Sequence, residues 1–218
     1  MGIAIVGAGG HGRVALECLE LSQGVSDEVV FFDDRSDELD AIEGVSVLGP
    51  IAALTEDSRF GSVFVAIGSN VERRRVFQAL ERAGKTFLTI IHPHTAISPR
   101  VTVGAGTIAV AGTVVNRDAC VGRGVIMNTL CSVGHDVIVE DFAQVSPGVN
   151  LGGAAVIEEG AFLGIGAKVV PEVRVGAWSV VGAGSVVLKD LPPRSFCIGT
   201  PARVVRELRD DEFPSNGG

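Results

Sequence analysis

The chain has 218 residues, and 29 of them are glycine, nearly twice the usual share of about 7%. Apolar residues make up 46% and aromatic residues only 5%, so a core must be built mainly from small aliphatic side chains. The net charge of −8 disfavours a nucleic-acid partner, and no apolar run approaches the roughly 18 residues needed for membrane insertion. The first residues lack the charged segment of a signal peptide and the four cysteines lack CxxC spacing, so we expect a cytoplasmic protein with reduced thiols.

The first predicted elements are a strand, a glycine turn and a helix. Residues 3–6 are apolar, the sequence Gly7-Ala8-Gly9-Gly10-His11-Gly12 follows at once, and residues 13–21 have helical apolar spacing. This is the context that the G-x-G-x-x-G motif requires, in which glycines let a pyrophosphate approach backbone N–H groups at a helix N-terminus. The alternative interpretation is a tight turn without a ligand.

A second apolar strand at residues 29–32 ends in Asp33 and Asp34, where an acidic pair could reach a ribose or a base. A third strand is predicted at 62–68. Ser69 and Glu72 then form a capping box for a helix that ends near Ala83, and a last strand is expected at 87–91. Three or four strands are too few for a complete dinucleotide domain, so residues 1–92 predict an α/β Rossmann-like half-domain that binds a mononucleotide or a nucleotide sugar.

The second half of the chain is dominated by a six-residue repeat. From Ile97 to Val187 every sixth residue is apolar, and a second track four residues later, starting at Val101, is small or β-branched. One large and one small inward position per short side, with glycine at the corners, is typical of a parallel β-helix with three sides per coil of eighteen residues. We predict five coils over 97–186, within a domain spanning 97–208. The period excludes an α-helix, and residues 209–218, which lack the repeat, are expected to be a mobile tail.

The order of these motifs resembles one known family. The glycine turn, Asp33-Asp34, Ala66-Ile67-Gly68, the hexapeptide coils and a closing Ile198-Gly199-Thr200-Pro201-Ala202-Arg203 are similar to the bacterial sialic-acid O-acetyltransferase and nucleotide-sugar N-acetyltransferase family, over about residues 2–205. The resemblance implies a left-handed β-helix, a homotrimer and acetyl-CoA in the groove between neighbouring β-helices. It also implies a nucleotide-linked amino sugar held by the N-terminal domain.

The chemistry of acetyl transfer to an amine requires a base with a pKa near neutrality. His135 is the only one of the four histidines within the coils, and it lies at a corner where its side chain can point outward. Asp136 follows it and can orient the imidazole, and the resemblance implies a supporting polar role for Asn128. We therefore predict direct attack on the thioester with His135 as general base.

The other site residues are implied by the resemblance. Gln144 stands where the family has a second histidine near the thioester. Its amide can donate a hydrogen bond there but cannot carry a charge. Backbone contacts to the pantetheine are implied at Gly153, Ile165 and Ala183, and Arg203 could meet the phosphates of the coenzyme, a plain surface charge being the alternative. The nucleotide sugar is assigned to six residues of the first domain: Gly9, Gly10, His11, Asp33, Asp34 and Gly68.

Other functions fit less well. A β-helix zinc enzyme needs three converging histidines, and the coils hold only His135, so we expect no metal. A non-catalytic nucleotide-sugar-binding trimer and O-acetylation of sialic acid, or of a related sugar hydroxyl, stay open. An oxidoreductase is disfavoured because no second catalytic domain follows the glycine turn.

Overall fold

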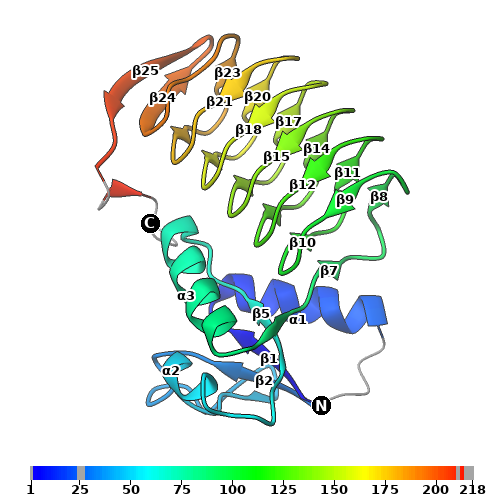
Figure 1. Cartoon of the computed structure of the whole chain (residues 1–218), viewed down its shortest axis with the longest axis vertical. Helices are drawn as coiled ribbons and strands as arrows, with labels where there is room; N and C mark the ends of the chain where they lie inside the picture. Colours follow the sequence, from blue (N-terminus) through cyan, green and yellow to red (C-terminus); the bar gives the residue numbers. More distant parts are fainter. Residues whose placement is uncertain (1, 24–27, 210–211, 214–218) are drawn as a thin grey trace.

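The structure is a computed structural model that describes residues 2–23, 28–209 and 212–213 (Figure 1). The N-terminal part is a four-stranded parallel sheet in the order β2-β1-β5-β6. Its strands and helices have the following bounds: β1 (Ile3–Val6), α1 (Gly10–Gln23), β2 (Val29–Phe32), α2 (Ile51–Leu54), β5 (Ser62–Val65), α3 (Asn70–Arg82) and β6 (Thr86–Phe87). A small antiparallel pair, β3 (Ala41–Ile42) and β4 (Val45–Ser46), lies between β2 and α2.

The alternation of side chains along β1 places the two long helices on opposite faces of this sheet. Ile3 and Ile5 are buried in one cluster with α1, whereas Ala4 and Val6 are buried in a second cluster with α3. Ser69 caps α3 by accepting a hydrogen bond from the Glu72 backbone N–H at 3.4 Å, as the sequence predicts. The Glu72 side chain does not complete the capping box, because it pairs with Arg75 instead.

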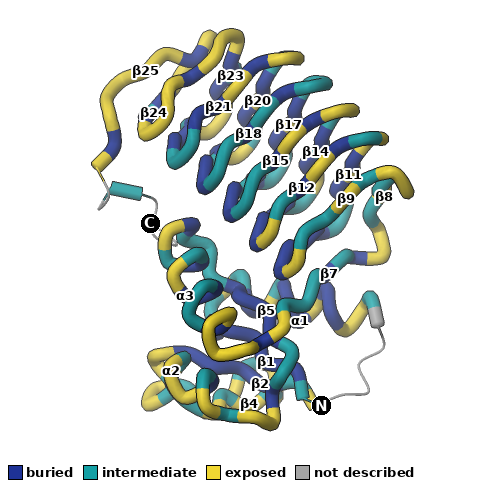
Figure 2. The backbone as a smooth tube through the Cα atoms, in the orientation of Figure 1, coloured by how far each residue is buried: buried dark blue, intermediate teal, exposed yellow. Residues whose placement is uncertain are grey.

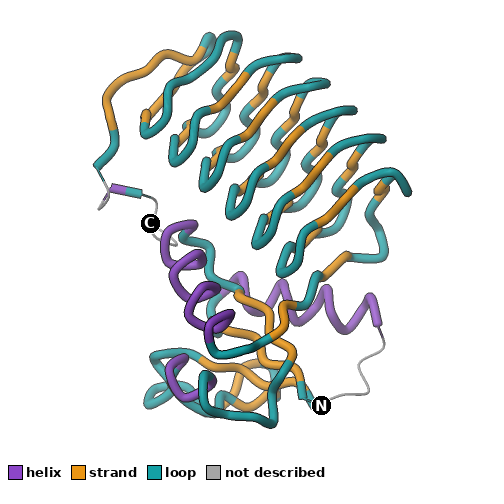
Figure 3. Tube along the Cα trace, viewed as in Figure 1, coloured by secondary structure: helices purple, strands orange, loops and turns teal. Residues whose placement is uncertain are grey.

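The second part is a left-handed β-helix with three parallel sheets, which Figure 3 shows as rows of short strands joined by turns. The β7 sheet contains β7 (Ile90–Ile91), β10 (Ile108–Ala109), β13 (Ile126–Met127), β16 (Gln144–Val145), β19 (Phe162–Leu163), β22 (Val180–Val181) and β24 (Ser195–Gly199). The β8 sheet contains β8 (Ala96–Ile97), β11 (Val114–Val115), β14 (Ser132–Val133), β17 (Asn150–Leu151), β20 (Lys168–Val169) and β23 (Val186–Val187). The β9 sheet contains β9 (Thr102–Val103), β12 (Cys120–Val121), β15 (Ile138–Val139), β18 (Val156–Ile157) and β21 (Arg174–Val175).

The eighteen-residue coil is visible in the strand register, which pairs Ile108 with Ile126 and Cys120 with Ile138. Both apolar tracks of the sequence point inward, and nearly all of their residues are buried. Figure 2 shows buried residues as dark blue segments that recur along the coils. A final strand, β25 (Ala202–Glu207), pairs antiparallel with β24 and ends the coils.

The start of the β-helix differs from the sequence expectation. A single strand over 87–91 was expected to end the first domain, but Thr86–Phe87 pairs with β5 and Ile90–Ile91 pairs with β10. The physical reason is that Ile91 lies six residues before Ile97 and so falls in the same inward register. The coils therefore number about six rather than five. Most of the expected tail, 209–218, lies outside the described residues, which include only 209 and 212–213 of it.

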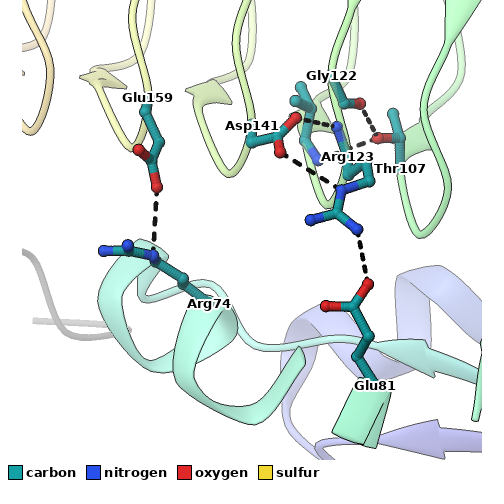
Figure 4. Close-up of polar contacts among 8 residues, drawn as sticks. Arg74, Glu81, Thr107, Gly122, Arg123, Asp141 and Glu159 are labelled. Carbon is teal, nitrogen blue, oxygen red and sulfur yellow. Dashed lines mark hydrogen bonds and ion pairs between the residues drawn. The ribbon is translucent and has the colours of Figure 1, made fainter. Parts of the chain in front are cut away.

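The N-terminal part packs on one side of the β-helix. Helix α1 shares a buried cluster with Ile108 and Ile126, so it covers the β7 sheet. Helix α3 lies along the edge between the β9 and β7 sheets, where Figure 4 shows Arg74 paired with Glu159 and Glu81 paired with Arg123. The edge shared by the β8 and β9 sheets lies opposite the β7 sheet in a triangular cross-section.

A buried arginine of α3 strengthens this contact. Arg73 is 1% exposed, and burial lowers the pKa of its guanidinium to about 9. It donates to the carbonyl oxygens of Gly124 and Phe142 on the β-helix, both at 2.8 Å, and to those of Ile67 and Gly68 beyond β5. Because breaking these bonds would leave buried carbonyl groups unsatisfied, Arg73 joins the two parts rigidly.

Among the residues that the structure describes, no helix has the length and apolar character to cross a membrane.

Candidate active site

The glycine turn forms the first candidate site. A Cβ at position 12 would lie 2.1 Å from the Gly7 carbonyl oxygen, so only glycine lets α1 begin this close to the end of β1. A Cβ at Gly9 or Gly10 would meet no atom within 4 Å, so these two residues face open space. The turn therefore presents backbone rather than side chains to that space, at the N-terminus of α1.

A cavity of about 620 Å³ occupies this space, at the carboxyl ends of β1, β2 and β5. That edge is where open parallel sheets bind ligands, and the volume is in the range of small-molecule sites. It is lined by the glycine turn, the segment after β2, the start of α2, the end of β5 and the start of α3: Gly7, Gly9, Gly10, His11, Asp33, Asp34, Arg35, Ile51, Ala66, Ile67 and Glu72. Five of the six residues assigned to the nucleotide sugar are in this set.

The acidic pair stabilises the walls of the cavity. Asp33 accepts hydrogen bonds from the Ala8 backbone N–H at 2.8 Å and from the Arg35 backbone and side chain. Burial raises the pKa of Asp33, but these hydrogen bonds outweigh burial and lower the pKa below its usual value. Asp34 accepts from the Ile51 backbone N–H at 2.9 Å. The sixth assigned residue, Gly68, does not line the cavity, since its carbonyl turns toward Arg73.

His11 lines the same cavity and has a buried polar atom. Its Nε2 is inaccessible to solvent and has no hydrogen-bond partner among the described residues. Burial, followed by the nearby positive charge of Arg73, lowers the pKa of His11 to about 4. The imidazole is therefore neutral at physiological pH.

This neutral imidazole predicts a loss of stability in acid. The unfolded chain binds a proton at His11 below pH 6.5, but the folded chain does so only near pH 4. The contribution of the neutral His11 imidazole to the free energy of unfolding is present in full above pH 6.5. It is lost as the pH falls toward 4, and the total loss is about 3 kcal/mol. The free energy of unfolding, measured by urea denaturation across this pH range, should fall less steeply for His11→Gln than for the wild type. Equal slopes would contradict the assignment.

The second candidate site is the edge between the β8 and β9 sheets, which we name the His135 edge and define by the turns 116–118, 134–136 and 152–154. His135 follows Gly134 in the turn after β14, and its side chain is 65% exposed. The Ala154 backbone N–H donates to the His135 carbonyl at 2.8 Å, and the Asp136 N–H donates to the Arg117 carbonyl at 3.2 Å. These ladder bonds hold the backbone of the turn, while the imidazole remains free to meet a ligand.

The imidazole has an acidic partner. His135 Nδ1 lies 2.7 Å from Asp136 Oδ2. When Nδ1 donates its proton to this carboxylate, Nε2 carries the lone pair that a general base needs. Asp136 has a φ of 58°, in the left-handed region, which aspartate tolerates better than most residues. Asp136 thus occupies a left-handed turn position, and its carboxylate contacts the side chain of the preceding residue.

Gly153 makes room for this imidazole. A Cβ at position 153 would lie 2.5 Å from His135 Nε2 and 2.6 Å from Cε1. The ring thus extends over Gly153, which lies one coil further along the β-helix. Three of the predicted residues, His135, Asp136 and Gly153, therefore lie together.

The other predicted catalytic-domain residues lie elsewhere in one chain. Asn128, Ile165 and Ala183 occupy turns on the edge between the β7 and β8 sheets, and Ile165 is 63% exposed there. Gln144 lies on β16 of the β7 sheet, where its Oε1 is buried without a partner among the described residues. Arg203, on β25, donates to the neighbouring Ala202 carbonyl at 2.9 Å. A single chain therefore does not bring these residues to His135.

Sequence reasoning missed residues that line the cavity and one residue at the contact between the two parts. Arg35 and Ile67 line the cavity, and the rule that ligands bind at the carboxyl ends of parallel strands could have found them. Arg73 gave no sequence signal, because a charged residue on a helix is normally solvent-exposed. Cys131, which lies on the inward track that starts at Val101, is buried, and burial raises the pKa of its thiol to about 11. This protonated thiol is unsuited to carry an acetyl group.

These features define a class of protein: a hexapeptide-repeat β-helix with a nucleotide-type α/β domain at its N-terminus and a histidine–aspartate pair on one edge. Two family models match the chain, the PglD N-terminal domain over residues 2–80 and the bacterial transferase hexapeptide (six repeats) over residues 154–189.

Solved structures extend the similarity to nearly the whole chain. Perosamine N-acetyltransferase from Caulobacter crescentus, in complex with CoA and GDP-perosamine, is 35% identical, with a TM-score of 0.88 over 95% of this chain and 98% of that one. The acetyltransferase domain of PglB from Neisseria gonorrhoeae, in complex with acetyl coenzyme A, is 33% identical, with a TM-score of 0.89 over 94% of this chain and 98% of that one. The chain therefore belongs to the family of acetyl-CoA-dependent sugar N-acetyltransferases in which a PglD-type domain precedes a left-handed β-helix.

Curated relatives match only part of the chain. Galactoside O-acetyltransferase from Lactococcus lactis is 49% identical over 57 residues, which is 26% of this chain and 28% of that protein. The chain thus matches little more than a quarter of the length of this relative.

Proposed function

We propose that the chain transfers the acetyl group of acetyl-CoA to the amino group of a nucleotide-linked amino-dideoxy sugar. The observation that carries this proposal is the His135–Asp136 pair, 2.7 Å apart, on a β-helix that follows a domain with a cavity at its glycine turn. The similarity to structures that contain CoA and GDP-perosamine supports both substrates.

The chemical step is a direct attack. The amine nitrogen forms a bond to the thioester carbonyl carbon, His135 Nε2 accepts the proton of the nitrogen, and the carbon–sulfur bond breaks as the CoA thiolate leaves. The thiolate then takes a proton, and Asp136 stabilises the imidazolium between the two transfers. The closest cysteine in sequence, Cys131, is buried, so no covalent acetyl-enzyme is proposed.

Release of the CoA thiol tests this function. A panel of UDP-, GDP- and dTDP-linked amino sugars, with free sialic acid as the hydroxyl acceptor, would be mixed with acetyl-CoA and the freed thiol measured. We expect release with at least one nucleotide amino sugar and an N-acetyl product by mass spectrometry. Turnover with sialic acid alone would indicate O-acetylation, and binding without turnover would indicate a sensor.

The site also requires a second copy of the chain. The cavity belongs to the domain that covers the β7 sheet, whereas His135 lies on the edge opposite that sheet, so one chain cannot place one sugar at both. We propose a homotrimer in which one copy presents its Asn128, Ile165 and Ala183 edge to the His135 edge of the next. Sedimentation at micromolar concentration should give three times the chain mass, and a monomer would contradict this arrangement.

The glycine turn provides a selective test of the acceptor site. A Cβ at Gly9 meets no protein atom within 4 Å, so the Gly9→Val side chain should project into the cavity without a clash. It should then obstruct the pyrophosphate. The KM for the nucleotide sugar should rise about tenfold or more, while the KM for acetyl-CoA stays within about twofold. Equal changes in the two KM values would show that the variant is misfolded rather than that its acceptor site is blocked.

A further inference from the structure

Helix α3 separates the cavity at the glycine turn, which we name the acceptor cavity, from a second cavity. Glu72, in the first turn of α3, lines the acceptor cavity. The second cavity has a volume of about 380 Å³, and α3 contributes four of its lining residues at helical spacing: Val71, Arg74, Arg75 and Gln78. Arg75 Nε donates to Glu72 Oε2 at 2.8 Å, so an ion pair joins the walls of the two cavities. A movement of the first turn of α3 therefore changes both.

Trp178, the only tryptophan of the chain, lines the second cavity from the β-helix. It lies in the turn between β21 and β22, and its backbone N–H donates to the Glu159 carbonyl of the preceding coil at 2.8 Å. A Cβ at position 160 would overlap the indole, so the ring extends over Gly160. The indole therefore rests on the backbone of the β-helix.

The first turns of α3 are attached to the same two turns of the β-helix. The Arg74 guanidinium carbon lies 5.2 Å from the centre of the Trp178 ring, within the range of a cation–π interaction. Its Nε lies 3.2 Å from Glu159 Oε1, as Figure 4 shows. Asn70 Nδ2 donates to the Gly160 carbonyl at 3.0 Å. The position of α3 on the β-helix thus depends on contacts at and below the indole.

Phe213, which follows the last strand, packs on the indole as well. The Trp178 and Phe213 ring centres are 5.7 Å apart with an interplanar angle of 89°, an edge-to-face contact, and Phe213 also lines the second cavity. The preceding residue, Glu212, pairs with Arg206 of β25 at 2.8 Å. Residues 212–213, drawn in red in Figure 1, lie below β25 and beside α3. The end of the β-helix and the N-terminal domain therefore meet at Trp178.

We propose that Phe213, Trp178 and Arg74 are positioning residues for the acceptor, because together they clamp α3 on the β-helix and hold the wall of the acceptor cavity in its binding conformation. This inference rests on the proposed function and adds a determinant of acceptor affinity outside the acceptor cavity. A wall that is already ordered loses less conformational entropy when a ligand binds. Acetyl-CoA affinity is independent of the clamp, since the His135 edge is a different edge of the β-helix.

Equilibrium binding tests the clamp without relying on turnover. Calorimetric titration of the full-length protein with UDP, GDP and dTDP would identify the nucleoside diphosphate that binds, and its Kd would be measured for each variant. Phe213→Ala and Arg74→Ala should each raise this Kd by about two- to tenfold, the usual effect of losing one aromatic or cation–π contact. Trp178→Phe, which keeps an aromatic ring, should raise it less than Trp178→Ala. The Kd for acetyl-CoA should stay within about twofold in all four variants.

Fluorescence of the single tryptophan gives a second readout. Phe213→Ala exposes more of the indole to water, so the emission should shift to longer wavelength. Adding the nucleoside diphosphate should change the emission of the wild type, because a ligand in the acceptor cavity orders α3 and Arg74 lies over the indole. A merely structural role for Phe213 would lower Tm and leave the emission insensitive to the ligand.

The matched control is Arg59→Ala. Arg59 also pairs with a carboxylate, that of Asp57, and its guanidinium carbon lies 5.3 Å from the centre of the Phe60 ring. These residues precede β5, so they lie at the edge of the sheet away from the acceptor cavity. The nucleoside diphosphate Kd of Arg59→Ala should equal that of the wild type.

Three outcomes would overturn the proposal: an unchanged nucleoside diphosphate Kd in Phe213→Ala, an equal rise of that Kd in Arg59→Ala, or a wild-type chain that binds no nucleoside diphosphate. If Phe213→Ala and Arg74→Ala weaken this binding but the wild type transfers no acetyl group, the proposed function fails while the clamp stands.

Discussion

Replacing His135 with alanine is expected to lower kcat by about 10²–10⁴-fold, the usual contribution of a positioned general base. The side chain is exposed, so its removal leaves no cavity in the core and should not alter folding. Acetyl-CoA affinity should change little, because the imidazole acts on the proton of the amine. Steady-state kinetics with the nucleotide sugar identified by thiol release would measure the effect.

The conservative variant at the neighbouring position refines this test. Asp136→Asn keeps the base but removes the negative charge 2.7 Å from Nδ1, so it should lower kcat by less than His135→Ala. If His135→Ala keeps more than about a tenth of the wild-type kcat, the base assignment is wrong, and catalysis rests on proximity and oxyanion donors.

Adding one methyl group at Gly153 is expected to lower the activity by displacing the His135 side chain. The new Cβ would lie 2.5 Å from His135 Nε2, so the imidazole must move off its position. A displacement of about 1 Å at a catalytic group can lower the rate about 100-fold. We therefore expect kcat of Gly153→Ala to fall by about 10- to 100-fold, with little change in Tm because the ring is exposed and can move into solvent.

A double variant separates displacement of the base from other effects of the methyl group. In the His135→Ala background, Gly153→Ala should cause almost no further loss of kcat, since no imidazole remains to be displaced. If the two losses multiply instead, Gly153 acts through the coenzyme contact that the resemblance implies. An unchanged kcat in the single variant would show that the ring does not work from its observed position.

Much of the fold was predictable because its determinants are local and periodic. The inward residues recur every six positions from Ile97, and this alone indicates a β-helix, since burying one side chain on each short side requires that period. Ser69 at the start of α3 and the glycine turn after β1 are local signals too. Each determines the structure of only the few residues next to it. The exception was the boundary between the two parts. Ile90 and Ile91 suit either a Rossmann-type strand or a first coil, and only pairing with β10 decides between them.

The sequence by itself determined the two architectures, the histidine–aspartate pair of adjacent residues and the glycines that leave the cavity open. Only the tertiary structure decided which of these residues meet, because three sheets distribute successive turns over three different edges. It placed Asn128 and His135, seven residues apart, on different edges, and Arg117 and His135, eighteen residues apart, in adjacent turns. It also buried Arg73 between the two parts, where contacts distant in sequence fix the side of the β-helix that the cavity occupies. In a β-helix, proximity follows the coil rather than the distance along the chain.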